Sequence, residues 1–226
     1  MPEADKGAAP AASTATRTAR QQRRRDRSRE EILDAARKVL LSKGLSGMTL
    51  EAVAREAGMS KTGLYYYFAS KDALAFELVY SALEGHATAV STAVDSSNDG
   101  GEALGAIVRE TVHTFAPNMD DFRLAFMTGQ VATSGRVEIS AEQFARIRPL
   151  NDLTLGGAST LLAKDREHGK SGPAVEPRLL AFLAYLSAIG LLTMKGMVEA
   201  QGDPLLYSDE QLIEGFARVF ERAAKG

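Results

Sequence analysis

The sequence predicts an all-α protein. Apolar residues recur every three or four positions over most of the chain after residue 28, which is the spacing of one helix face. Ser or Thr precedes several of these runs as a potential N-cap, and Glu or Gln often follows three positions later. No stretch shows the alternation of apolar and polar residues that indicates a half-buried strand.

Residues 1–27 are rich in Ala, Thr, Gln and Arg and hold almost no large apolar side chain. Such a segment buries too little surface to offset its ordering entropy, so we expect a disordered basic arm. Seven arginines gather between residues 17 and 29, namely Arg17, Arg20, Arg23, Arg24, Arg25, Arg27 and Arg29. A run of this kind attracts phosphate, although a solvated, solubilising tail is an alternative interpretation.

The three helices that follow have recognisable ends. Order is expected to begin at Ser28, where Ser-Arg-Glu-Glu has the pattern of a capping box, and Gly44 suits the end of this helix. Thr49 can cap a second helix, which Gly58 closes. Ser60 can cap a third, very short helix. Together they predict a three-helix domain.

The remaining sequence predicts a second, larger set of helices. Ser70 caps a fourth helix, which a Gly-, Ser- and Asn-rich loop at 96–101 ends. Four further amphipathic or apolar segments follow, at 104–115, about 118–130, 140–164 and 178–199, and a last helix at 209–223. Pro149 is expected to kink or break the third of these segments.

The segment Leu179–Met194 has 16 residues without a charge. A membrane-spanning helix needs about 20 apolar residues, and Ser187, Gly190 and Thr193 dilute this stretch. A helix that is apolar on all sides is otherwise buried in a core or a subunit interface. We therefore expect an interface here and no membrane.

Charge is divided unevenly along the chain. The formal net charge is −2, but residues 1–75 hold 14 Lys+Arg and 9 Asp+Glu, a net of +5, which leaves −7 on residues 76–226. With the change in composition, this divides the chain into a basic arm at 1–27, the three-helix domain at 28–75 and a helical domain at 76–226. Cys is absent, which excludes disulfides and metal–thiolate sites, and no secretory signal follows Met1, so we expect a cytoplasmic protein.

Two short helices joined by Gly58-Met59-Ser60 have the form of a helix-turn-helix. Leu64 and Phe68, four residues apart, share the inward face of the second helix, and its other face presents Lys61, Thr62, Tyr65 and Tyr66. A purely structural role for the three consecutive tyrosines is the alternative. Adjacent helix residues lie about 100° apart, however, so all three cannot face one core. A short exposed helix of this kind suits the major groove of DNA.

Residues from about 28 to 80 resemble the DNA-binding domain of the TetR/AcrR family of bacterial transcriptional regulators. The resemblance is carried by Gly44, Thr49, Ala54–Ser60 (A-x-E-A-G-x-S), Leu64–Phe68 (L-Y-x-Y-F) and Ser70–Leu74 (S-K-D-x-L). It covers nearly a quarter of the chain, and the remainder resembles the family in the number, length and order of its helices.

The resemblance implies contacts with double-stranded operator DNA. It places Thr49, Ser60, Lys61, Tyr65, Tyr67 and Lys71 at the phosphate backbone and Thr62, Gly63 and Tyr66 near the bases. The order Thr62–Gly63 departs from the family, which often has Gly directly after the Lys, and leaves open which side chain reads a base. Some members with such extensions use a basic arm on DNA, which implies the same for Arg23, Arg24, Arg25 and Arg27.

The resemblance also implies that residues from about 76 bind a small effector and form a homodimer through the last two helices. The contacting residues would be Leu183, Leu186, Ile189, Gly190, Met194, Met197, Phe216, Val219 and Phe220. Ligand binding would move the fourth helix and release a repressor from a palindromic operator. Candidate pocket residues are His86, His113, Phe122, Phe126, Met127 and Phe144, which indicate an apolar or aromatic effector, although ordinary core packing also explains them.

Two other functions compete with this interpretation. A helical enzyme would need a nucleophile motif, a phosphate loop or a His–carboxylate pair, and the sequence shows none. A nonspecific architectural protein could use the basic arm but would not need the acidic domain. His86, His113 and His168 do not have metal-ligand spacing, so neither a metal nor another cofactor is expected.

Overall fold

The computed structural model describes residues 10–127, 140–168, 175–201 and 207–225. Within these ranges all regular structure is helical and no residue lies in a strand, which confirms the all-α fold class. The chain forms two compact units, Met1–Leu78 and Val79–Gly226. The division lies three residues beyond the predicted boundary at 75.

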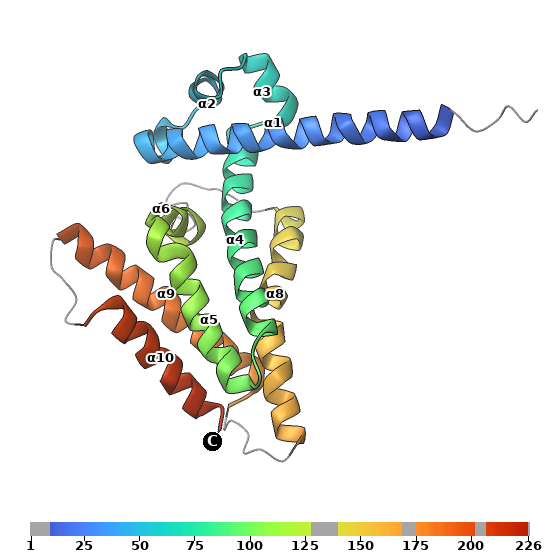
Figure 1. Ribbon diagram of the computed structural model, residues 1–226. Helices are drawn as coiled ribbons and strands as arrows, with labels where there is room; N and C mark the ends of the chain where they lie inside the picture. The colour runs from blue at the N-terminus through green and yellow to red at the C-terminus, as the bar shows by residue number, and fades with distance from the viewer. Residues whose placement is uncertain (1–9, 128–139, 169–174, 202–206, 226) are drawn as a thin grey trace, which may run out of the picture. The chain divides into compact units, whose positions relative to one another are not determined.

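The first unit contains α1 (Pro10–Gly47), α2 (Leu50–Glu56), α3 (Lys61–Tyr67) and the first turns of α4 (Lys71–Asp95) (Figure 1). Its small core is apolar, as burying one face of each helix requires. The fully or nearly fully buried side chains are Ile32, Ala36, Met48, Val53, Leu64, Phe68, Leu74 and Leu78.

Helix α1 differs from the predicted disordered arm, because it begins at Pro10 and runs straight through Ser28. Ser28 is therefore not a cap. Ala, Arg and Gln favour the helix, and a proline suits its first position. A helix already formed by the packed residues after 28 extends without a new nucleus. Side-chain pairs one turn apart add support: Gln22 donates to Asp26 at 2.7 Å and Arg27 to Glu31 at 3.1 Å.

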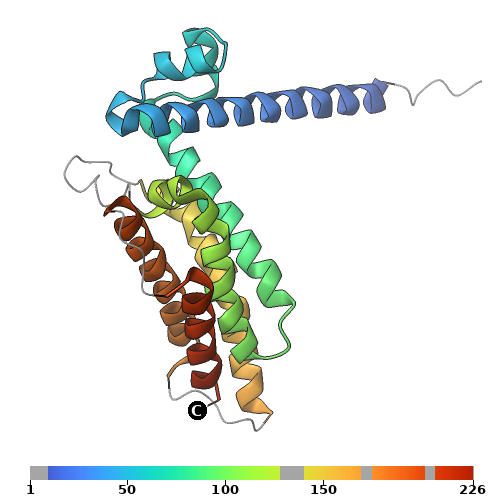
Figure 2. The same cartoon turned by 60° about the vertical axis from the view of Figure 1, so that its left-hand side comes forward.

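The second unit contains the rest of α4, α5 (Gly100–Phe115), α6 (Met119–Phe122), α8 (Ala141–Glu167), α9 (Pro177–Gln201) and α10 (Asp209–Ala223). A 3₁₀ turn at Ala116–Asn118 precedes α6 and a π turn at Arg123–Met127 follows it. Helix α5 packs against α8, α9 and α10 (Figure 2). Its side chains Leu104, Ile107, Val108, Val112 and Phe115 are buried at the centre of this core.

Several predicted helix ends in the second unit are confirmed and others shift. Ser140 and Ser208 form capping boxes with Gln143 and Gln211, as predicted for a Ser that precedes an apolar run and has Gln three positions later. Helix α5 begins inside the predicted loop, because Asp99 caps it by accepting from the Glu102 amide at 2.8 Å. Residues 128–130 of the predicted helix at 118–130 lie outside the described residues.

Of the two outcomes expected at Pro149, a kink or a break, the break is wrong, because α8 continues through this residue. Proline removes one main-chain hydrogen bond and adds a steric clash with the preceding turn. Here the residue is exposed, and the helix after it is held by buried Leu150, Leu155 and Ala158. Packing of that face outweighs the local cost.

Candidate nucleic-acid interface and effector pocket

The turn between α2 and α3 is fixed by main-chain and capping hydrogen bonds. Thr49 accepts from the Ala52 amide at 3.1 Å and so caps α2. At the other end Gly58 has φ of +64°, which lets the Met59 amide reach the Ala54 carbonyl at 2.9 Å. Ser60 then accepts from the Gly63 amide at 3.0 Å and starts α3. All the residues that form this turn are local in sequence.

Helix α3 has a buried face and an exposed face. Leu64 and Phe68 are buried, which matches the predicted inward pair. Tyr66 is 67% exposed and Tyr65 46%. Lys61 and Thr62 are exposed as well, whereas Gly63 and Tyr67 are half-buried. The helix therefore presents polar and aromatic side chains to solvent, beginning at its first turn.

The Lys61 side chain, a predicted phosphate ligand, already makes contacts within the first unit. Its ammonium pairs with the carboxylate of Glu51 on α2 and lies 5.8 Å from the centre of the Tyr65 ring. The hydrogen bond between them raises the pKa of Lys61 and lowers the pKa of Glu51. A phosphate near Lys61 must therefore compete with Glu51, a residue that sequence reasoning did not include.

The other predicted phosphate ligands lie around the same helix. Thr49 and Ser60 are exposed, and each hydroxyl accepts an amide hydrogen bond while its own proton can still be donated. Lys71 is half-buried in the first turn of α4. These three residues stand at the starts of three consecutive helices, α2, α3 and α4.

The arginines before Ser28 have different surroundings. Arg23, Arg24, Arg25 and Arg27 are all exposed. Arg25 places its guanidinium 5.5 Å from the centre of the Tyr66 ring. Arg27 pairs with Glu31 at 3.1 Å. The Arg17 side chain lies outside the described residues.

Arg29, the last arginine of the run between residues 17 and 29, contacts other helices of the first unit. Its guanidinium pairs with Glu77 of α4 at 2.8 Å and lies 4.6 Å from the centre of the Phe68 ring. The side chain of Glu77 is only 14% exposed. Arg29 thereby connects α1 with the end of α3 and with α4. Its charge is balanced by the carboxylate of Glu77 within the first unit.

Three of the six candidate effector residues come together in the second unit. His86 on α4 is buried and shares a 3.0 Å hydrogen bond with the Thr111 hydroxyl. Its ring stacks on Phe115 at 5.0 Å, and Phe115 in turn contacts Phe122 and Phe126 at 5.9 and 5.5 Å between ring centres. Burial lowers the pKa of His86 to about 4, so the ring is neutral at pH 7.

Two of the other candidates, His113 and Phe144, are not part of this aromatic cluster. His113 is exposed on α5, because it lies on the opposite side of the helix from buried Thr111 and Phe115. Phe144 is 59% exposed in the first turn of α8. The structure therefore does not bring either side chain to the cluster around His86, and their assignment to an effector pocket stays a prediction. The Met127 side chain lies outside the described residues.

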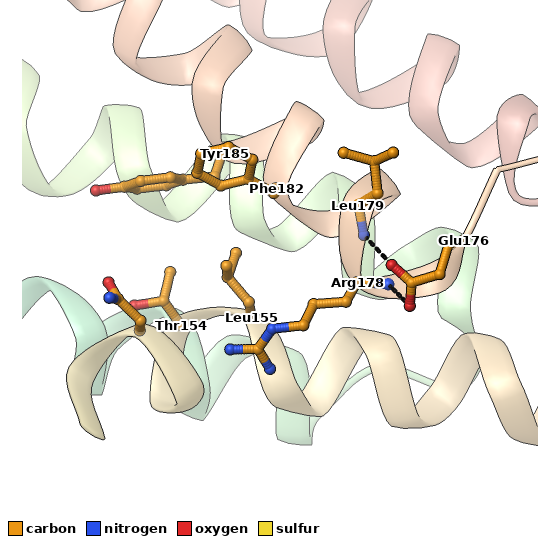
Figure 3. Close-up of a pocket in the computed structure, with 8 residues that line it drawn as sticks. Thr154, Leu155, Glu176, Arg178, Leu179, Phe182 and Tyr185 are labelled. Atoms are coloured by element: carbon orange, nitrogen blue, oxygen red, sulfur yellow. Dashed lines mark hydrogen bonds between the residues drawn. The ribbon is translucent and has the colours of Figure 1, made fainter. Parts of the chain in front are cut away.

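A pocket of about 340 Å³ lies between α8 and α9 (Figure 3). Its lining residues are Asn151, Thr154, Leu155, Glu176, Arg178, Leu179, Phe182 and Tyr185. Arg178 donates to Asp152 at 2.5 Å beside it. Glu176 accepts from the amides of Arg178 and Leu179, and these bonds lower its pKa. The pocket therefore combines apolar and aromatic walls with a charged edge.

Sequence reasoning missed every residue of this pocket. Tyr185 is the most informative of them, because its ring also lies 5.7 Å from His86 and 6.3 Å from Phe126. Burial raises the pKa of this tyrosine. The spacing of Leu179, Phe182 and Tyr185 along α9 is a detectable signal, but it is also the spacing of an ordinary packing face.

The exposed side of α9 is apolar. Within the described residues, the segment Pro177–Met197 is long and apolar enough for a membrane span by length and composition alone, and a third of it is buried. One such helix does not indicate a membrane protein, because core and interface helices have the same composition. Its exposed apolar side chains, with one from α10, are Leu179, Phe182, Leu183, Leu186, Met194, Met197 and Val219.

Comparison with known proteins agrees with this geometry. Residues 32–78 match the family model described as bacterial regulatory proteins, tetR family. The HTH-type transcriptional regulator LmrA of Bacillus subtilis (strain 168) is 31% identical over 94 residues, which are 41% of this chain and 50% of that protein. The match thus spans about half the length of this curated relative.

Solved structures share the fold over most of the chain. A TetR/AcrR family regulator from Thermobifida fusca YX-ER1 has a TM-score of 0.66 and 22% identity, covering 87% of this chain and 97% of its own. FadR from Bacillus subtilis, in complex with stearoyl-CoA, has a TM-score of 0.63 and 15% identity, covering 86% and 98%. At these identities the likeness shows a common fold. The resemblance to the TetR/AcrR family is confirmed.

Proposed function

We propose that this protein is a dimeric transcriptional regulator that binds operator DNA through α3 and responds to a small effector in its second unit. The observation that carries the proposal is the exposed face of α3 within the segment that matches the tetR family. Tyr66 is 67% exposed and Tyr65 46% on a helix whose Leu64 is fully buried, and tyrosine is enriched at binding interfaces. No catalytic role is proposed.

In the proposed complex, α3 lies in the major groove. Thr62, Gly63 and Tyr66 face base edges, because they occupy its exposed first turns. The surrounding phosphates are bound by Thr49, Ser60, Lys61, Tyr65, Tyr67 and Lys71, and the positive charge of Arg23, Arg24, Arg25 and Arg27 adds affinity for any duplex. Lys61 exchanges Glu51 for a phosphate.

The dimer is proposed to form through α9 and α10. Leu183, Leu186, Met194 and Met197 of α9 and Val219 of α10 are each 39–61% exposed in one chain. An apolar surface of this kind is normally covered by a partner. Phe220, in contrast, is buried in the chain's own core and is not available for the interface. A two-fold dimer fits a palindromic operator.

The effector is proposed to bind at the pocket between α8 and α9 and to act through Tyr185. Tyr185 lines the pocket and contacts the cluster of His86 and Phe126, and His86 belongs to α4. A ligand that prefers one arrangement of this cluster shifts the population of α4 positions. The apolar walls and Arg178 suit an apolar or aromatic molecule with an anionic group. FadR of Bacillus subtilis, with its stearoyl-CoA, binds a molecule of this general character.

The regulator is proposed to act as a repressor in the cytoplasm, as the family resemblance implies. Effector binding would lower its affinity for the operator. By linkage, operator DNA would lower its affinity for the effector by the same factor.

DNA binding is tested by fluorescence anisotropy with two duplexes, one selected by the protein from a randomised pool and one scrambled. Tyr66→Ala is expected to weaken the selected duplex by about 10- to 100-fold, since a base-contacting side chain contributes about 1–3 kcal/mol of discrimination. Lys71→Ala should lower the affinity for both duplexes by a similar factor, because a phosphate contact does not depend on the DNA sequence.

The same measurement separates the proposed regulator from an architectural protein. A wild-type protein that binds the selected and scrambled duplexes equally would support the architectural function. If neither Tyr66→Ala nor Lys71→Ala alters binding, the assignment of α3 to the groove is wrong.

A further inference from the structure

The arginines of the α1 extension, defined as residues 18–27, do not share one face. Successive residues of a helix are rotated by about 100°, so Arg25 and Arg29, four apart, lie on the same side. This is the side of the Tyr66 and Phe68 rings, at 5.5 and 4.6 Å from the two guanidinium carbons. By the same rotation, Arg20, Arg23 and Arg27 lie on the opposite side of the helix, and Arg24 lies about 100° from Arg25.

Arg25 and Tyr67 together hold the most exposed ring of α3. The Tyr67 ring meets Tyr66 edge-on, with 5.2 Å between centres and an angle of 87°. The Arg25 guanidinium lies 5.5 Å from the same ring centre. The Tyr66 side chain nevertheless stays 67% exposed, so these contacts restrict its orientation without covering it.

A fixed orientation matters for a side chain that must meet a base. A free tyrosine loses rotamer freedom when it binds, and a side chain that is already oriented loses less. The position of Arg25 beside α3 depends on the extension being helical, and α1 has no residue with non-helical φ/ψ between Pro10 and Gly44. A disordered arm could not place Arg25 beside α3.

We propose that Arg25 is a specificity-determining positioning residue, which orients Tyr66 toward the operator, while Arg20, Arg23, Arg24 and Arg27 supply only sequence-independent attraction. The inference rests on the proposed DNA-binding function. It divides the basic extension into one residue that affects sequence preference and four that affect affinity for any duplex.

The test compares Arg25→Ala with Arg24→Ala, each alone and combined with Tyr66→Ala. The two arginines are adjacent and their loss removes the same charge, but only Arg25 contacts the ring. Affinities for the selected and scrambled duplexes are measured by anisotropy over a range of salt concentrations. Far-UV circular dichroism confirms that α1 remains helical in each variant.

Arg24→Ala and Arg25→Ala are expected to lower the affinity for the scrambled duplex by the same factor. Arg25→Ala should lower the affinity for the selected duplex further, by a factor between about 2 and about 30, which is the range for a cation–π contact from an exposed to a desolvated site. This extra loss should vanish when Tyr66 is already Ala. Arg25→Lys should keep the salt dependence and recover only part of the preference, since an ammonium does not stack as a guanidinium does.

Equal losses for Arg24→Ala and Arg25→Ala on the selected duplex would overturn the inference. Additive effects of Arg25→Ala and Tyr66→Ala would do the same. If the wild-type protein shows no preference between the duplexes, the proposed function fails first, and the inference fails with it.

Discussion

At the scale of single residues, the clearest features are ionisable groups whose pKa the fold shifts. Lys61 and Glu51 form an exposed pair that must open for Lys61 to reach DNA. His86 is the opposite case, because its ring is 2% exposed and has a hydroxyl as its hydrogen-bond partner. The first bears on binding and the second on stability.

His86 predicts a pH-dependent stability. Burial lowers the pKa of the folded ring from 6.5 to about 4, so below pH 6.5 the unfolded chain takes up a proton that the folded chain does not. The stabilising difference is fully present above pH 6.5 and is lost as the pH falls toward 4. Between pH 7 and pH 5 we expect His86 to lower the free energy of unfolding by about 2 kcal/mol.

The measurement is urea unfolding at fixed protein concentration at pH 7 and pH 5, for the wild type and for His86→Phe. The change in the free energy of unfolding between the two pH values is compared between the two proteins. Their difference removes the contribution of the carboxylates that both share. The His86→Phe protein should lose about 2 kcal/mol less on acidification. An identical loss in both proteins would show that the buried histidine is not the origin.

At the scale of elements, residues close in sequence determine where helices end, and residues distant in sequence determine how closely helices pack. The caps at Thr49, Ser60 and Ser140 depend on residues within three positions, and each was predicted from sequence. The start of α1 was not, because the segment before Ser28 has no capping pattern that marks Pro10. The contact of α5 with α8 depends on Gly100, whose partner is distant in sequence.

Gly100 predicts a position-specific response to alanine. A Cβ atom there would lie 2.5 Å from Leu162 Cδ2 and 2.8 Å from its Cα, so the two helices would have to separate. Gly100→Ala should lower the free energy of unfolding by about 1–3 kcal/mol, as overpacking does.

Gly156→Ala is the matched control, because it lies in α8 with no atom within 4 Å of the added Cβ. It should raise the free energy of unfolding by about 0.5–1 kcal/mol through helix propensity. Both values are measured by urea unfolding. If both substitutions changed the free energy of unfolding in the same direction, the close approach of α5 and α8 at Gly100 would be contradicted.

At the scale of the whole molecule, the two units differ in charge and in surface. The basic charge is concentrated in the unit that carries α3, and the exposed apolar side chains of α9 and α10 belong to the other. This division matches a molecule in which one unit meets phosphate and the other pairs with a second copy. The proposed dimer can be tested without knowing the effector.

Leu186→Glu is predicted to dissociate the dimer, because it would bury a carboxylate among apolar side chains. The dissociation constant, measured by analytical ultracentrifugation, should rise by at least about 100-fold, and affinity for the selected duplex should fall as the two half-sites become unlinked. Leu41→Glu, at a similarly exposed position on α1, should leave the sedimentation unchanged. A dimer that tolerates Leu186→Glu would exclude this surface of α9 as its centre.

The sequence by itself determined the all-α fold class, the helix-turn-helix and the two faces of α3. The physical reason is that caps, turns and helix faces are set by residues a few positions apart, as with Ser60 and Gly63 or Leu64 and Phe68. The family resemblance rests on the same local pattern.

Only the tertiary structure decided which long-range neighbours meet. Composition groups the arginines before Ser28 as one basic run, but the continuity of α1 and the position of α3 place Arg25 on Tyr66. Likewise an apolar stripe does not show whether it packs or binds, so the pocket at Tyr185 followed from the approach of α8 and α9. Such contacts depend on how helices pack against one another, which no local spacing specifies.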